Sequence, residues 1–84
     1  MARILESAYR HGCDDKQILH AWRNFIAEFK EGDDPKKVIR IGFDGGVRLL
    51  EVGGEIFANG DEKIFHAMAA RKLYTERIGL RYGF

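Results

Sequence analysis

The sequence KIFHAMAARKLYT, at residues 63–75, changes its hydrophobic period part-way along. In its first half, successive side chains fall on two alternating faces, which is typical of a β-strand. Its second half begins the spacing of a buried helical stripe, formed by Ala70, Leu73 and Tyr74 and continued by Ile78 after the stretch. We therefore expect a strand that runs directly into a helix.

Such a junction would bring His66 and Arg71 close together. An imidazole, a permanent cation and the unpaired N–H groups of a helix start together favour an anion, and phosphate is the obvious candidate. The alternative is a strand histidine hydrogen-bonded to backbone, beside an arginine that only solvates the helix.

The composition is that of one small globular domain over residues 1–84, because 45% of the residues are hydrophobic and disordered chains have fewer. No apolar run approaches the roughly 20 residues of a membrane helix. The first ten residues, MARILESAYR, carry charges where a signal peptide is apolar. We therefore expect a cytoplasmic protein.

Cys13 is the only cysteine, which excludes an internal disulfide and a multi-cysteine zinc site within this sequence. A packing role beside a helix cap is favoured over a catalytic thiol. No His and carboxylate grouping has the spacing of metal ligands, and the glycine-rich stretches at 42–46 and 52–55 lack the lysine of a phosphate-binding loop. Neither a metal nor a cofactor is expected.

The net charge of +1 hides an asymmetry along the chain. Residues 63–84 have a net charge of +4, whereas residues 1–62 have a net charge of −3. A local basic face can bind a polyanion even on a nearly neutral protein. The alternative is an ordinary solvated helix.

The N-terminal part is predicted to contain two helices. Residues 2–10 have apolar side chains on one helical face and end at a glycine. Asp14 and Gln17 have the spacing of a capping box for a second helix, with Trp22 as its core anchor. Residues 25–30 fit either its last turn or a short strand, and we favour the strand.

The middle of the chain is predicted to form a β-meander. A loop is expected at residues 31–37, a half-buried strand at 38–43 and a second strand at 47–57 with a bulge or bend at its two glycines. Hairpin turns are expected at 44–46 and 59–61. The predicted fold is therefore α+β, with two N-terminal helices, an antiparallel meander of three to four strands and a C-terminal helix.

We expect the helices to cover one face of this meander and to leave the other face open. Phe65 and Ala67 would face the helices. The open face would then carry His66, Arg40 and either Arg48 or Glu51.

The order of these segments resembles the BrnT-like toxins of bacterial toxin–antitoxin modules. The resemblance covers residues 7–77 and rests on a His-Gly pair before a helix, a hydrophobic hairpin strand, and a final strand that runs into a basic helix. It implies a small ribonuclease of RelE-like fold that is neutralised by an antitoxin protein. The matching residues are His11, Gly12, Leu49, Leu50, Val52, His66, Ala67, Arg71, Lys72 and Tyr74. Many relatives have arginine where this chain has Met68, so Arg71 or His66 would have to supply its function.

Cleavage of RNA without metal requires proton transfer and stabilisation of charge on the phosphorane. His66 is the candidate acid or base, Arg40 and Arg71 are candidates to hold the phosphate, and Glu51 is a candidate base. Further candidates for RNA contacts are Lys63, Lys72, Tyr74 and Arg48. Tyr74 as a core residue is the alternative.

A second class of function stays open, which is a module that only binds another protein. It would use the glycine-interrupted strand at 47–57, or the apolar residues Leu80, Tyr82 and Phe84. Cleavage depends on His66 and Arg71, whereas docking depends on apolar surface.

Overall fold

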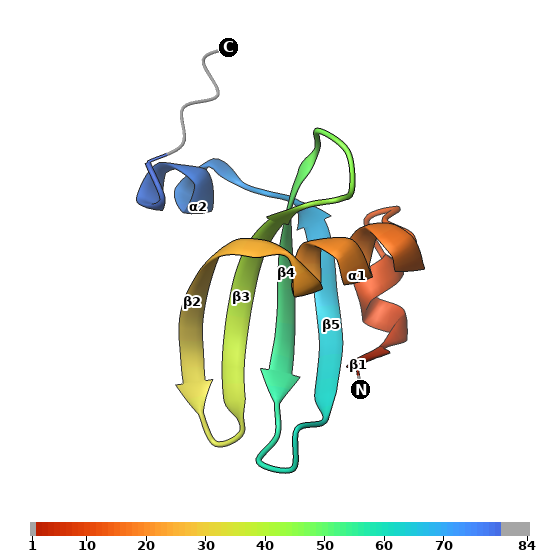
Figure 1. Ribbon diagram of the computed structural model, residues 1–84, viewed down its shortest axis with the longest axis vertical. Coiled ribbons are helices and arrows are strands. Elements are labelled where there is room, and N and C mark those ends of the chain that lie inside the picture. Colours follow the sequence, from red (N-terminus) through yellow and green to blue (C-terminus); the bar gives the residue numbers. More distant parts are fainter. Residues whose placement is uncertain (1, 80–84) are drawn as a thin grey trace.

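The computed structural model describes residues 2–79 and shows one five-stranded sheet with two α-helices and a short 3-10 helix (Figure 1). The elements in chain order are β1 (Ala2–Ile4), η1 (Glu6–Tyr9), α1 (Asp15–Arg23), β2 (Phe25–Asp33), β3 (Lys36–Phe43), β4 (Leu49–Ile56), β5 (Glu62–Ala69) and α2 (Lys72–Arg77). Residues 80–84, where the sequence suggests a docking tail, lie outside the described residues.

The sheet has the strand order β1-β5-β4-β3-β2. Strands β2 to β5 form the predicted antiparallel meander, whereas β1 pairs in parallel with β5, so that Ala2 lies opposite Glu62. Figure 1 shows β1 beside β5, at the edge opposite β2. The domain is α+β, but the predicted RelE-like arrangement is wrong, because the strand β1 and a short 3-10 helix replace the first of the two N-terminal helices and the sheet has five strands.

The predicted helix at residues 2–10 fails because its apolar side chains also fit a strand. Ala2 and Ile4 pack against the core, whereas Arg3 between them is exposed, which is a period of two. The backbone N–H of Leu5 donates to the carbonyl oxygen of Ile64 at 2.8 Å. Pairing along β5 therefore replaces the hydrogen bonds that a helix would have made locally.

Helix α1 begins as predicted. The side chain of Asp14 accepts from the backbone N–H of Gln17 at 2.9 Å, and the side chain of Gln17 accepts from the N–H of Asp14 at 2.9 Å. This capping box is confirmed, and so is the strand that follows the helix from Phe25. Within residues 2–79, neither α-helix has the length and apolar character needed to cross a membrane.

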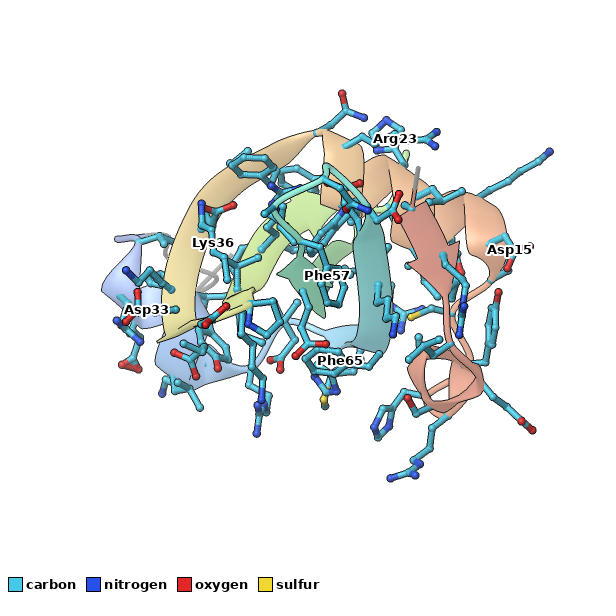
Figure 2. The ribbon with its side chains drawn as sticks, turned by 90° about the horizontal axis from the view of Figure 1, so that it is seen from below. Asp15, Arg23, Asp33, Lys36, Phe57 and Phe65 are labelled. Carbon is cyan, nitrogen blue, oxygen red and sulfur yellow. The ribbon has the colours of Figure 1, made fainter. Side chains whose placement is uncertain are left out.

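The two α-helices cover opposite faces of the sheet, which corrects the expectation that they share one face. The first core lies on the α1 face and includes Trp22 from α1 with Val52 from β4. The second core lies on the α2 face and includes Tyr74 from α2 with Ile39 and Leu49. Figure 2 shows the labelled Arg23, at the end of α1, and Phe65, on β5, on opposite sides of the sheet.

Two glycines let α1 approach the sheet closely. A Cβ atom on Gly42 would lie 2.4 Å from the carbonyl oxygen of Ala21, and one on Gly54 would lie 2.7 Å from the ring of Trp22. Both distances are shorter than any contact that a real Cβ makes. Trp22 is fully buried, as predicted, because both strands below α1 lack a side chain at these points.

The pairing of β4 with β5 is irregular between Gly53 and Gly54, where the sequence predicts a bulge or bend. His66 pairs with Gly53 and Ile64 pairs with Gly54, so Phe65 is the extra residue of a bulge. Phe65 therefore leans to the α2 face beside His66, so the expectation that Phe65 and His66 lie on opposite faces is wrong.

Candidate functional site

Glu51 is a fully buried carboxylate in the middle of the central strand β4. One of its oxygens lies 2.9 Å from Nε2 of His66. Arg71 donates to the same carboxylate from its backbone N–H at 2.9 Å, from Nε at 3.0 and 3.2 Å, and from Nη2 at 2.9 Å. We call Glu51, His66 and Arg71 the Glu51 cluster.

Three elements position this cluster. Glu51 lies on the α2 face because it pairs with Ile41, a residue of the second core. His66 lies on the same face because it pairs with Gly53, two positions after Glu51 on β4. Gly53 leaves room for the imidazole, since a Cβ there would lie 3.2 Å from Cβ of His66. Arg71 is the extended residue before α2, which directs its backbone N–H to Glu51 rather than to an anion in solvent.

The charges in the cluster are stabilised mutually. Burial raises the pKa of Glu51, but the hydrogen bonds from Arg71 and His66 outweigh burial and bring this pKa below its ordinary value. The hydrogen bonds and charge of Glu51 raise the pKa of Arg71. Glu51 is therefore ionised at neutral pH and compensated by Arg71. The side chains of His66 and Arg71 are 28% and 51% exposed, so both reach solvent.

His11 lies beside the cluster. Its ring centroid is 6.1 Å from that of His66, and the two ring planes are at 76°. The sequence singles out His11 only as half of a His-Gly pair. Its neighbour Gly12, with a φ of +82°, ends the turn after η1, but no sequence spacing indicates that this turn lies over β5.

Arg40 does not join the cluster, and its predicted place beside His66 is wrong. It lies opposite Val52 in the sheet and therefore on the α1 face. Its guanidinium carbon is 4.1 Å from the ring centroid of Trp22 and 4.3 Å from that of Phe25. Its Nε donates to Glu28 at 2.8 Å. Arg40 thus joins β2, β3 and α1, and its side chain is only 12% exposed.

The residues predicted to contact RNA are dispersed. Arg48 is exposed and donates at 3.9 Å to the sulfur of Cys13, a residue of the core on the α1 face, and so does not share the face of His66. Tyr74 is buried against Phe29 at a centroid distance of 5.6 Å, so its ring is not exposed for stacking on a base.

The two lysines differ in their position. Lys63 lies over the ring of Phe57 at 5.3 Å, near the turn between β4 and β5 and away from the cluster. Lys72 directly follows Arg71, is highly exposed, and pairs with Glu76 at 3.8 Å. Of these four candidates, only Lys72 adds an exposed positive charge next to the Glu51 cluster.

Cys13 is buried at the start of α1. Burial raises the pKa of its thiol, and the nearby charge of Arg48 does not overcome this effect. The protonated thiol is a poor nucleophile, which supports the packing role.

No protein-family model, curated protein or solved structure matches the chain. The resemblance to BrnT-like toxins therefore stays a prediction from the sequence. Across the described range 2–79, no three His, Cys, Asp or Glu side chains are grouped closely enough to hold a metal ion.

Proposed function

We propose that this chain is a metal-independent endoribonuclease that cleaves RNA at the Glu51 cluster. The observation that carries the proposal is the contact between His66 and Glu51. A partly exposed imidazole is hydrogen-bonded at 2.9 Å to a fully buried carboxylate. Such a carboxylate orients an imidazole and stabilises its protonated form, as in other acid–base sites.

The proposed reaction is attack of a ribose 2′-hydroxyl on the adjacent phosphorus. Glu51 engages Nε2 of His66, so Nδ1 is the nitrogen that accepts the proton of the 2′-hydroxyl. The bond between the 2′-oxygen and phosphorus forms while the bond to the 5′-oxygen breaks. The products are a 2′,3′-cyclic phosphate and a 5′-hydroxyl. DNA lacks the nucleophile and is not a substrate.

Arg71 is the residue proposed to bind the phosphate. Its Nε and Nη2 are engaged by Glu51, which fixes the plane of the guanidinium. Its side chain is half exposed, so its solvent-facing N–H groups can donate to a phosphate oxygen. The exposed ammonium of Lys72 would strengthen the attraction for the RNA backbone.

The proposed biological role is that of the toxin in a toxin–antitoxin module, with the antitoxin protein as partner. The support for this role is the resemblance in sequence order, together with a site chemistry suited to RNA. The alternative docking strand at residues 47–57 corresponds to β4, whose backbone is already paired with β3 and β5. Its edges therefore offer no place for another strand, which weighs against the alternative module.

A cleavage assay with matched histidine variants tests the proposal. Purified protein is incubated with free total RNA in EDTA, and separately with intact ribosomes in a magnesium buffer, beside His66→Asn, Arg71→Lys and His20→Asn. We expect the His66 variant to be about 10²- to 10⁴-fold slower, because one proton-transfer group is lost. Arg71→Lys keeps the charge but loses the planar fork, so it should also be slower.

His20→Asn is the control because His20 lies on α1, where its Nδ1 contacts the carbonyl oxygen of Phe43 at 2.9 Å. It should cleave at the rate of the unchanged protein. Intact RNA in both forms, from protein with a native circular dichroism spectrum, would refute the proposed function. Equal rates for the His66 and His20 variants would refute the assigned site.

A further inference from the structure

His66 accounts for only one of the two proton transfers that RNA cleavage needs, because the departing 5′-oxygen must also be protonated. The geometry points to His11 as the second group: we propose that His11 and His66 flank one phosphate, and that His11 is the general acid. This inference rests on the proposed function and adds a catalytic residue to it.

The position of His11 is fixed by the attachment of the N-terminal segment to β5. The hydroxyl of Ser7 donates to the carbonyl oxygen of Phe65 at 2.6 Å, and the N–H of Leu5 donates to that of Ile64 at 2.8 Å. The N–H of Gly12 then closes the turn on the carbonyl oxygen of Tyr9 at 3.1 Å. These bonds hold η1 along β5 and place the exposed His11 next to His66.

The separation of the two rings suits a shared phosphate. Their centroids are 6.1 Å apart. A proton-transfer group must come within about 3 Å of its oxygen. Two imidazoles at this separation can therefore each reach a different oxygen of a phosphate that binds along their exposed edges. His11 is exposed and the side chain of His66 is partly exposed, so both rings can be reached from solvent.

The carboxylate decides which histidine is the base. Glu51 stabilises the imidazolium that His66 becomes when it takes the proton of the 2′-hydroxyl. His11 has no carboxylate hydrogen-bonded to its ring in the part of the chain that the structure describes. With Nδ1 of His66 assigned to the 2′-hydroxyl, His11 is the neighbouring imidazole left to give a proton to the departing 5′-oxygen. Each histidine finishes the step in the opposite protonation state, so the protons balance.

The charges of the site do not repel an anion. The negative charge of Glu51 is compensated by Arg71, whose side chain is half exposed. The exposed ring of His11 beside His66 adds a hydrogen-bond donor for the phosphate. Phosphate binding should consequently depend on His11 even when no bond is cleaved.

The first test measures binding of inorganic phosphate and of uridine 3′-phosphate by NMR of the three imidazoles. We expect the ring signals of His11 and His66 to shift with one common midpoint. The signal of His20 should not move, since this residue lies on the α1 face. His11→Asn should weaken binding about tenfold, as expected for one lost hydrogen bond to a charged group. A His11 signal that stays fixed would overturn the shared phosphate site.

The second test compares two substrates with different leaving groups. Uridylyl-adenosine needs a proton on its departing 5′-oxygen, whereas the 4-nitrophenyl ester of uridine 3′-phosphate releases a stable anion. If His11 is the acid, His11→Asn should slow the dinucleotide about 10²-fold or more and the nitrophenyl ester by less than tenfold. His66→Asn should slow both substrates.

The outcomes separate this inference from the proposed function. Equal slowing of both substrates by His11→Asn, or no slowing of either, would overturn the acid role while the ribonuclease itself stands. No cleavage of either substrate by the unchanged protein, together with intact RNA in the assay of the proposed function, would overturn the proposed function and the acid role together.

Discussion

The close approach of α1 to the sheet at Gly42 makes a substitution there costly. In Gly42→Ala, the new methyl group would lie 2.4 Å from the carbonyl oxygen of Ala21, whereas ordinary contacts begin at 3.4 Å. The obstacle is helix backbone, which cannot rotate away as a side chain can. Helix α1 must therefore move from the sheet by about 1 Å.

The cost follows from what α1 buries. Helix α1 has three side chains that are fully buried, those of Ile18, Ala21 and Trp22. A gap of 0.5–1 Å forfeits roughly a quarter to a half of the dispersion energy of each contact. Truncating a buried aromatic residue costs about 3–5 kcal/mol, so partial loss of its packing costs about 1–2 kcal/mol. With the other two side chains, the free energy of unfolding should fall by about 2–3 kcal/mol, within the range for overpacked cores.

Urea and thermal unfolding measure this effect. Stability for a chain of 84 residues is roughly 4–13 kcal/mol, so the loss is a large fraction. The melting temperature should fall by about 10–20 °C. Gly32→Ala is the control, because its Cβ would lie 3.4 Å from Cβ of Lys37, and it should change stability by less than about 0.5 kcal/mol.

Two results would refute this reasoning. The first is equal stability of Gly42→Ala and Gly32→Ala, which would mean that α1 does not approach the sheet as described. The second is a large loss of RNA cleavage by folded Gly42→Ala, because α1 and the Glu51 cluster lie on opposite faces of the sheet.

Two further changes separate stability from catalysis. Arg40→Met should lower the free energy of unfolding by about 1–3 kcal/mol, since it removes the stacking on Trp22 and the bond to Glu28. The rate of RNA cleavage by the folded protein should stay unchanged, and slower cleavage by fully folded Arg40→Met would contradict this prediction. Burial raises the pKa of Glu51, yet Arg71 and His66 bring this pKa below the ordinary value of about 4.3. The contribution of ionised Glu51 to the stability of the folded protein is therefore complete above about pH 4.3 and is lost as the pH falls through the lowered pKa. Urea titrations between pH 7 and 3 should therefore show a shallower loss of stability in Glu51→Gln than in the unchanged protein, and identical slopes would contradict this.

Local patterns in the sequence predict most of the meander and the start of α1. The capping box of Asp14 and Gln17 needs only neighbouring residues, and the turns at 44–46 and 59–61 carry their own glycines. The strand at residues 2–4 could not be predicted in this way. Its hydrogen-bond partners are sixty positions away on β5, and its apolar spacing fits a helix equally well.

The candidate site was predicted in part. The sequence brings His66 and Arg71 together because both flank the same strand-to-helix junction. The prediction that Arg40 shares the face of His66 failed. The alternation of side chains along β3 shows that Arg40 and Ile39 lie on opposite faces, but it does not show which helix covers each face. His11 was missed as a partner of His66 because their contact depends on the pairing of β1 with β5.

The dependence of Glu51 on a residue twenty positions later bears on the order of events during translation. Strands β2, β3 and β4 are joined by short turns and can pair as soon as they leave the ribosome. At that stage Glu51 still lacks both His66 and Arg71, and His11 still lacks the strand to which its segment is tied. A nascent chain that has not yet exposed residue 71 therefore cannot carry the complete site. Under the proposed function, the ribosome would be protected from the nuclease that it is making until this last part emerges.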